Sequence, residues 1–271
     1  MITENPIVSI VMPVYNADQY LAESIESILN QTFRDFEFII ICDSPSEMTI
    51  EIIHNYQHHD KRIQAIFQER AGLTASLNKG FSIARGKYIA RMDADDISHP
   101  DRLQKQVSYL DRNPKCSLVC SHIECIDKSG NFSGYWNADI QTKNAPEIKK
   151  RLPIKNCIAH PTVMIRQSII KKYPYDQHQK NSEDYDLWLR MASDNLILCK
   201  LPEFLLKYRK HPSSVSKGAS PVSLRIKCKM GFLYKQVLQG NFSQFNLIIL
   251  VFLLLDLISW PFSFMYLWLT K

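Results

Sequence analysis

Tyr88-Ile89-Ala90-Arg91-Met92-Asp93-Ala94-Asp95-Asp96 decides the fold of this chain, because a short apolar run after Gly86 ends abruptly in three carboxylates. Buried apolar runs of this kind predict central strands, and crowded anions cannot enter the core of a sheet without a large desolvation cost. The carboxylates are therefore expected at the carboxyl edge of the sheet, where open α/β sheets bind ligands. Like charges so close together repel, and a divalent cation with oxygen ligands relieves that repulsion. The alternative is a solvated acidic turn that caps a helix beginning near Pro100.

The composition is that of a globular protein of 271 residues, with 45% hydrophobic and 22% charged residues. That length predicts one large α/β domain with additions, or two small domains. The formal net charge of +6 is modest, and without a clustered basic stripe it does not predict a nucleic-acid partner. The seven cysteines form no CxxC pair, and Cys116, Cys120 and Cys125 lack a fourth zinc ligand at suitable spacing. We expect reduced, mostly buried thiols in a cytosolic protein, and the polar residues 1–6 predict no signal peptide.

Strand and helix signals alternate along the first hundred residues, which implies parallel pairing through right-handed crossovers. Asp18 is the expected N-cap of the first helix, and Gly86 is expected to end the third. The expected strands are residues 8–14, 36–42, 63–67 and 88 onward, with helices at 18–29, 46–58 and 73–84. Farther along we expect a helix at 100–112, a strand at 116–125, an irregular region at 127–153, a strand at 160–165 and a helix at 184–194.

The carboxyl end, residues 246–269, is almost wholly apolar and is interrupted by Asp256 and Pro261. As a helix it would be about 36 Å long, enough for a hydrocarbon core of about 30 Å. The apolar residues offset the roughly 3 kcal/mol cost of an Asp at mid-span only narrowly. An interfacial or re-entrant hairpin and a soluble core helix are therefore alternatives to a span. Lysines and arginines are frequent between Glu203 and Asp256, where no acidic residue occurs. This favours contact with anionic headgroups and places the main domain in the cytoplasm.

Four motifs together resemble the inverting family 2 glycosyltransferases of the GT-A fold, particularly bacterial enzymes that build surface polysaccharides. The motifs are Val8-Ser9-Ile10-Val11-Met12-Pro13-Val14-Tyr15-Asn16, Ser27-Ile28-Leu29-Asn30-Gln31-Thr32-Phe33, Asp93-Ala94-Asp95-Asp96 and Glu183-Asp184-Tyr185-Asp186-Leu187-Trp188-Leu189-Arg190. A lone Asp-x-Asp is weak evidence, whereas four motifs in the family's order, over roughly residues 7–212, are strong evidence. The chain departs from the family at Cys42-Asp43-Ser44-Pro45-Ser46-Glu47, where the family often has Asp-Asp-Gly-Ser-Thr-Asp and only the second acidic position is kept.

The resemblance implies an α/β fold with a Rossmann-like mixed sheet flanked by helices over residues 1–215. A basic segment at 216–245, with a hinge near 218–221, and a hydrophobic membrane-associating tail at 246–271 would follow.

The resemblance also implies a divalent cation, Mn2+ or Mg2+, on the diphosphate of the sugar donor, and hard carboxylate oxygens suit either ion. Asp95 is the implied direct ligand, Asp93 binds the metal shell or the donor ribose, and His211 is a further implied ligand. No role is settled for Asp96. Asp184 occupies the place of the family's general base, which removes the proton of the acceptor hydroxyl. The alternative is that Asp184 and the preceding glutamate only complement a helix N-terminus.

Donor binding is implied at the edge of the first two strands. Pro13, Tyr15 and Asn16 close the first strand, and Tyr15 can stack on a base. Asp43 can accept the N3–H of uracil, a donor that cytosine lacks; its alternative role is an ordinary helix cap. The resemblance implies further contacts to the donor or acceptor, although each of these residues could instead lie at the surface or in the core without a functional role. They are Arg70, Lys79, Glu183, His160 and His211.

The predicted function is transfer of a sugar from a UDP-sugar to a lipid-linked saccharide in lipopolysaccharide, O-antigen or capsule synthesis, at the cytoplasmic face of the plasma membrane. One alternative is a membrane-associated nucleotide-sugar-binding protein without turnover, whose mark would be loss of Asp95 or Asp184, and neither is lost. The other is a metal-dependent nucleotidyltransferase, but the glycine-rich phosphate loop of that class is missing after the first strand. Release of UDP rather than pyrophosphate separates these readings.

Overall fold

The computed structural model describes residues 5–179, 182–211, 221–240 and 243–269, and for residues 221–224 and 259–269 it describes the backbone alone. Residues 216–220, which hold most of the predicted hinge and the start of the predicted basic segment, lie outside the described ranges. The division of the chain into three parts stays a prediction.

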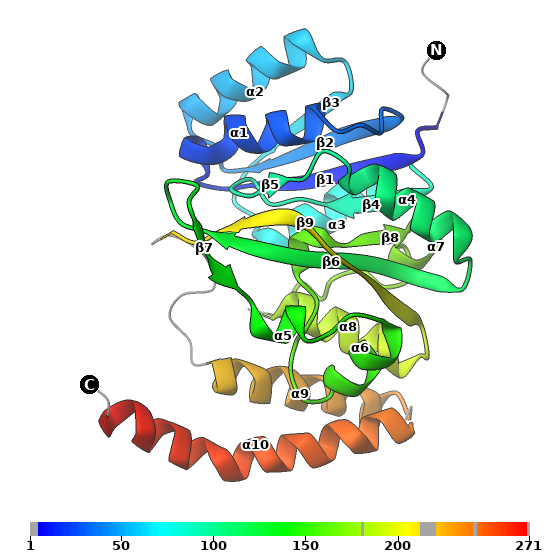
Figure 1. Ribbon diagram of the computed structural model, residues 1–271, viewed down its shortest axis with the longest axis vertical. Helices are drawn as coiled ribbons and strands as arrows, with labels where there is room; N and C mark the ends of the chain where they lie inside the picture. The colour runs from blue at the N-terminus through cyan, green and yellow to red at the C-terminus, as the bar shows by residue number, and fades with distance from the viewer. Residues whose placement is uncertain (1–4, 180–181, 212–220, 241–242, 270–271) are drawn as a thin grey trace.

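A mixed sheet forms the centre of the molecule, with strand order β3-β2-β1-β4-β8-β6-β9-β5 and β7 paired to β6 (Figure 1). The first four strands along the chain are parallel, as the alternating pattern predicted. β8 is antiparallel to both β4 and β6, and this reversal makes the sheet mixed. The strands are β1 (Val8–Val14), β2 (Phe36–Asp43), β3 (Ile63–Gln68), β4 (Tyr88–Arg91), β5 (Ile97–Ser98), β6 (Cys116–Ile126), β7 (Phe132–Tyr135), β8 (Met164–Arg166) and β9 (Ile197–Arg209).

Helices cover both faces of the sheet, because successive residues of each buried strand point to opposite sides. In β1, Ile10 and Met12 belong to the core cluster that includes residues of α1, α2 and α4, whereas Val11 belongs to the cluster on the other face, which includes residues of α3, α8 and the last two helices. The helices are α1 (Asp18–Leu29), α2 (Glu47–His59), α3 (Leu73–Ile83), α4 (Arg102–Arg112), α5 (Asn137–Ile140), α6 (Ala145–Arg151), the 3-10 helix η1 (His160–Thr162), α7 (Gln167–Ile170), α8 (Glu183–Ser193), α9 (Pro221–Leu238) and α10 (Gln244–Leu269).

Parallel pairing brings the carboxyl ends of the central strands to one edge of the sheet. β1 ends at Val14, opposite Cys42 of β2, and the next residue of β2 is Asp43. β4 also runs parallel to β1 and ends at Arg91, immediately before the acidic turn. The carboxylates therefore emerge where the sequence predicted, beside the ends of β1 and β2.

Several local predictions were wrong for reasons that the contacts explain. Asp18 does not cap α1, whose N-cap is Ala17; its carboxylate instead accepts hydrogen bonds from Ser46 and Thr49 at the start of α2. Gly86 does not end α3, which stops at Ile83. Glycine is required there because a Cβ would lie 2.4 Å from the backbone nitrogen of Ser9 in β1.

Two stretches of secondary structure also differ from the sequence-based expectation. The region 127–153 was expected to be irregular, yet it contains β7, α5 and α6. The strand expected at 160–165 begins as η1 and becomes β8 only at Met164. The proline at position 161 has no N–H to donate to a strand neighbour, which favours the helical turn.

The apolar carboxyl end forms the helix α10, which packs against α9 along one side of the molecule (Figure 1). Phe245, Ile249 and Leu253 of α10 join the core that includes α8. Across the part of the chain that the structure describes, no helix is long and apolar enough to cross a membrane. The predicted spanning tail therefore has no support.

Candidate active site at the carboxyl edge of the sheet

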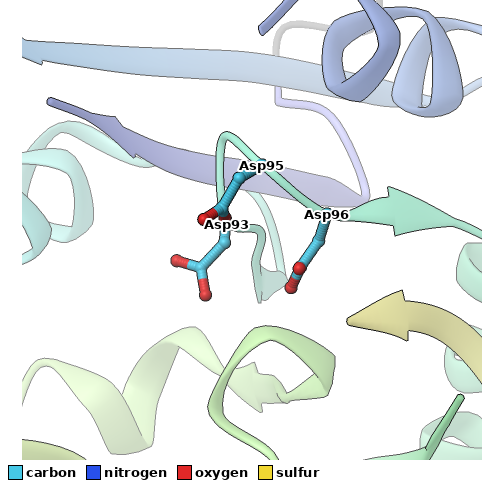
Figure 2. Close-up of side chains that lie close together, drawn as sticks. All are labelled: Asp93, Asp95 and Asp96. Atoms are coloured by element: carbon cyan, nitrogen blue, oxygen red, sulfur yellow. The ribbon is translucent and has the colours of Figure 1, made fainter. Parts of the chain in front are cut away.

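Three carboxylates gather in the turn that follows β4. Asp93, Asp95 and Asp96 point to the same side of this turn (Figure 2), and their ligand atoms lie within 4.8 Å of one another. One oxygen of Asp96 accepts a hydrogen bond from the backbone N–H of Arg209 at 2.9 Å, but Oδ2 is buried and has no hydrogen-bond partner among the residues that the structure describes. Burial, followed by the charges of the other two carboxylates, raises the pKa of Asp96 well above its usual value. An unused, buried carboxylate oxygen beside two further carboxylates fits a divalent cation with oxygen ligands.

The backbone of this acidic turn is held by two other elements. Ser24 of α1 donates its hydroxyl to the carbonyl oxygen of Asp93 at 2.8 Å. Arg209, the last residue of β9, donates its Nε–H to the carbonyl oxygen of Asp95 at 2.9 Å. These contacts use backbone oxygens, so they fix the turn without occupying the carboxylate oxygens.

His211 lies beside Asp95, with its Nε2 atom 2.8 Å from Asp95 Oδ2. The group of potential ligands among the described residues contains the three carboxylates and not this histidine. In the present geometry His211 orients the Asp95 carboxylate, and its predicted role as a metal ligand stays a prediction.

Two adjacent acids begin α8 on the other side of the site. Asp184 is held by two donors, the Nδ2 of Asn156 at 2.8 Å and the backbone N–H of Tyr185 at 2.7 Å. Burial raises the pKa of Asp184. Burial and the neighbouring Asp184 raise the pKa of Glu183 to about 7. Ser182, which precedes them, has a φ of +55°, in the left-handed region that non-glycine residues rarely adopt. Such backbone strain beside a pair of buried carboxylates is a frequent mark of a functional site.

Arg91 is the buried cation between these two acidic groups. Its guanidinium pairs with both oxygens of Asp93, at 2.5 and 2.7 Å. It also counteracts the burial that raises the pKa of Glu183 and of Asp184. The acidic turn and the first turn of α8 therefore share one electrostatic environment, although they lie far apart in the sequence.

His160 lies in the same part of the site, with Nδ1 4.0 Å from Glu183 Oε1 and Nε2 2.5 Å from the Tyr175 hydroxyl. Burial, followed by the charge of Arg91, lowers the pKa of His160 well below its usual value. At neutral pH the ring is therefore uncharged and can exchange one hydrogen bond with the tyrosine.

A second cluster lies at the ends of β1 and β2. The guanidinium of Arg70 stacks on the ring of Tyr15, 3.4 Å from its centroid, and pairs with Asp43 Oδ2 at 2.6 Å. The other donors to Asp43 are the backbone N–H groups of Ala71 at 2.6 Å and Gly72 at 2.9 Å, together with the Gln68 side chain. Asp43 therefore does not cap the helix that follows it, because Ser46 caps α2.

The remaining predicted residues lie at or near this edge. Pro13 is in β1 opposite Ile41, and Asn16 follows β1 with a φ of +50°. Lys79 donates a hydrogen bond to the Gln68 side chain at 3.0 Å, and Gln68 in turn donates to Asp43. Sequence reasoning thus placed the acids correctly at the ends of elements, and their functional roles stay predictions.

The sequence analysis missed four residues that organise the site: Arg91, Asn156, Tyr175 and Arg209. Arg91 was read as part of an apolar strand, although an arginine that directly precedes an acidic turn signals an ion pair. Arg209 lies two positions before His211, but only the histidine was singled out there. The roles of these three residues depend on contacts across 15 to 114 positions of sequence.

Comparison with known proteins shows which family this chain resembles in sequence. Residues 9–174 match the model of the family described as glycosyl transferase family 2. An uncharacterized glycosyltransferase of Methanocaldococcus jannaschii is 44% identical over 76% of this chain and 71% of its own length. The O-antigen biosynthesis glycosyltransferase WbnJ of Escherichia coli is 39% identical over 78% of this chain and 83% of its own length.

Solved structures share the fold at low sequence identity. The TarS protein of S. aureus, crystallised in complex with UDP-GlcNAc, superposes with a TM-score of 0.73 at 17% identity, over 91% of this chain and 71% of that one. A mannosyltransferase from Pyrobaculum calidifontis, in complex with GDP-Man and Mn2+, gives a TM-score of 0.63 at 15% identity, over 91% and 69% of the two chains. These likenesses support the predicted GT-A-like α/β fold with its mixed sheet.

Proposed function

Because the chain belongs to glycosyl transferase family 2 and is therefore a glycosyltransferase, we propose that it moves a sugar from a UDP-sugar to a saccharide acceptor with inversion at the anomeric carbon. One observation carries this proposal: a carboxylate cluster with an unpartnered buried oxygen lies in the same electrostatic environment as Asp184. The cluster suits a cation and a diphosphate, while the carboxylate of Asp184 on the other side of the site suits a proton acceptor.

In the proposed reaction the carboxylate of Asp184 takes the proton of the acceptor hydroxyl. The acceptor oxygen forms a bond to C1 of the sugar as the bond from C1 to the diphosphate breaks, and UDP leaves with that electron pair. Attack opposite the leaving group gives a β-linkage from an α-linked donor. Asn156 and Tyr185 each donate to one Asp184 oxygen, which fixes the carboxylate and leaves lone pairs for the incoming proton.

Asp95, Asp93 and Asp96 are the residues that would hold Mn2+ or Mg2+, and His211 would orient Asp95. When bound, such an ion supplies Lewis-acid stabilisation of the charge that develops on the diphosphate. In the proposed site the buried guanidinium of Arg91 keeps Asp93 ionised and in position through its two hydrogen bonds.

For the base of the donor, we propose that uracil stacks on Tyr15 and donates its N3–H to Asp43. Four donors now occupy Asp43, so one must yield. Arg70 is the one free to move, because its side chain is 52% exposed whereas Ala71 and Gly72 donate from the backbone. The guanidinium would leave the face of Tyr15 and contact the base or a phosphate.

The proposed acceptor is a lipid-linked saccharide of lipopolysaccharide, O-antigen or capsule synthesis, at the cytoplasmic face of the plasma membrane. Support comes from the name of the Escherichia coli relative, an O-antigen biosynthesis enzyme. Similarity at 39% identity supports the class of pathway but does not identify the sugar.

The test is a panel of UDP-sugars with saccharide acceptors, scored by acceptor-dependent release of UDP and by the anomeric configuration of the product. We expect UDP and an inverted linkage, both dependent on Mn2+ or Mg2+. Release of pyrophosphate would indicate a nucleotidyltransferase, and a product with retained configuration would contradict the role of Asp184.

A further inference from the structure

The helices α9 and α10, here called the hairpin, carry an apolar face that points away from the protein core. Five residues of α10 spaced along one side of the helix are 50% to 67% exposed: Leu247, Val251, Leu254, Leu255 and Ile258. At 100° per residue they lie opposite Phe245, Ile249 and Leu253, which are buried in the core. On α9 a matching exposed stripe contains Met230, Tyr234, Val237 and Leu238. Soluble monomers rarely expose so many large apolar side chains together.

Asp256, the acidic residue in the apolar run, lies on the inward side of α10. Arg225 of α9 pairs with its Oδ1 atom at 2.5 Å, and Lys229 pairs with Oδ2 at 2.8 Å. A placement of α10 across a bilayer would separate this carboxylate from both cations, whereas a placement along the surface preserves the pairs. The hairpin can therefore bury its outer face in an apolar medium at no cost to Asp256.

The surroundings of the hairpin are basic. Lys229 donates to the carbonyl oxygen of Ile154 at 3.1 Å, which fixes the turn after α6 against α9. Three basic residues, Lys149, Lys150 and Arg151, end α6 shortly before this half-exposed isoleucine, and both lysines are exposed. No Asp or Glu occurs in residues 148–175 or 204–255. Exposed apolar side chains beside exposed lysines match a surface that offers both hydrocarbon and negative charge.

We propose that the hairpin lies flat in the surface of an anionic lipid bilayer, with the outer stripes of α9 and α10 in the interface and the turn after α6 against the headgroups. The occupant is a membrane rather than a second copy of the chain, because two copies would bring the exposed Lys149 and Lys150 of each copy together at the shared face. Membrane binding through the outer stripes of α9 and α10 does not depend on the proposed catalytic activity.

The hairpin is attached along the helix that carries the proposed base. Cys228 of α9 lies 3.9 Å from the carbonyl oxygen of Ser182, next to the first turn of α8. At the other end of α8, the hydroxyl of Ser193 donates to Asn246 of α10 at 2.9 Å. A membrane that holds the hairpin would thus hold α8, and with it Asp184, one helix layer from the lipid.

The test is flotation of the full-length protein with vesicles, which needs no catalysis and therefore does not depend on the proposed reaction. Vesicles of equal parts phosphatidylglycerol and phosphatidylcholine should carry the protein upward, and a wash with alkaline carbonate should release it. Val251→Gln/Leu255→Gln should lower the partition coefficient at least tenfold, because both side chains would leave the hydrocarbon. Lys149→Gln/Lys150→Gln should lower it roughly thirtyfold on these vesicles and little on phosphatidylcholine alone.

The matched control is Met48→Gln/Phe67→Gln, which removes two exposed apolar side chains far from the hairpin and should leave flotation unchanged. Folding of each variant is checked by circular dichroism and urea unfolding, and all four substituted hydrophobic positions are already exposed. The proposal is overturned if the wild-type protein does not float, or if the hairpin and control variants float alike. A dimer that Val251→Gln/Leu255→Gln dissociates, without flotation, would assign the face to a second copy. Retention through the carbonate wash would contradict the flat placement.

Discussion

Replacing Asp184 by asparagine tests the proposed chemistry most directly, because the two side chains have the same shape and only the proton-accepting group is lost. The structure also predicts a cost in stability. Asn156 cannot turn to accommodate the new amide, since its own Oδ1 accepts the backbone N–H of Ile158 at 3.1 Å. The new NH2 group would face the Asn156 NH2 group, while its carbonyl oxygen keeps the bond from Tyr185. One lost buried hydrogen bond should lower the free energy of unfolding by about 1–3 kcal/mol.

The effect on turnover should be much larger than the effect on binding. A positioned general base contributes about 10²–10⁴-fold to the rate, so kcat should fall by about a thousandfold, equivalent to about 4 kcal/mol of transition-state stabilisation. The donor should bind within about threefold of its wild-type affinity if Asp184 acts on the acceptor side. The assay is steady-state release of UDP together with calorimetric titration of the donor in Mn2+.

Two control variants separate the base from its surroundings. Asn156→Ala keeps the carboxylate but removes a donor to its charged form, so the pKa of Asp184 should rise and the acid limb of the kcat profile should move to higher pH. Glu183→Gln changes the neighbouring acid while Asp184 stays intact. If Asp184→Asn kept kcat within tenfold of the wild-type value, or if Glu183→Gln caused the greater loss, Asp184 would not be the base.

Three further predictions follow from the same geometry. Burial and Asp184 raise the pKa of Glu183 to about 7. Between about pH 4.5 and about pH 7 the folded protein therefore holds a proton that the unfolded chain has released. Across this window the free energy of unfolding falls as pH rises. Glu183→Gln should remove this dependence, with a gain of up to about 3 kcal/mol above the window, measured by urea unfolding across pH; parallel pH profiles for variant and wild type would contradict it. Asp96→Asn should raise Tm in the absence of metal, because a neutral amide replaces the buried carboxylate. The same variant should weaken Mn2+-dependent donor binding in calorimetry, and Asp95→Ala should abolish that binding. Unchanged donor affinity in both variants would rule out the cation site. Gly86→Ala should lower the free energy of unfolding by at least about 2 kcal/mol, because its Cβ would lie 2.4 Å from the Ser9 nitrogen. Gly231→Ala is the comparison that should cost less, because its Cβ would meet only the Gln179 side chain at 4.0 Å.

The parts of the fold that the sequence predicted are those whose signal is local. β1, β2 and β4 are buried on both faces and therefore appear as continuous apolar runs. β9 was not anticipated because lysines interrupt it, and one of them, Lys200, is fully buried. Its ammonium group pairs at 2.5 Å with the buried carboxylate of Asp139. That partner is 61 positions away, so no window of sequence could reveal it.

The site divides in the same way. Asp93, Asp95 and Asp184 could be found because charged residues at the ends of apolar elements stand out against their neighbours. Asn156 could not be assigned, because an asparagine in a loop acquires its role only from what the fold places beside it, whereas the local pair of Arg91 with Asp93 could have been read from the sequence. The inward position of Asp256 was hidden for the same reason, and the sequence alone counted it as a charge facing lipid.

The acidic site is built at a cost to the stability of the fold. Burial raises the pKa of Asp93, Asp96 and Asp184 together, which means that each ionised carboxylate is less stable in the folded protein than in water. Arg91 offsets part of this cost, but Asp96 Oδ2 still has no partner. A fold that only needed stability would place a neutral side chain at Asp96, where the buried carboxylate lacks a donor to one oxygen. Their presence at one edge of the sheet is therefore best explained by a ligand that brings positive charge, and the stability lost without it should return when it binds.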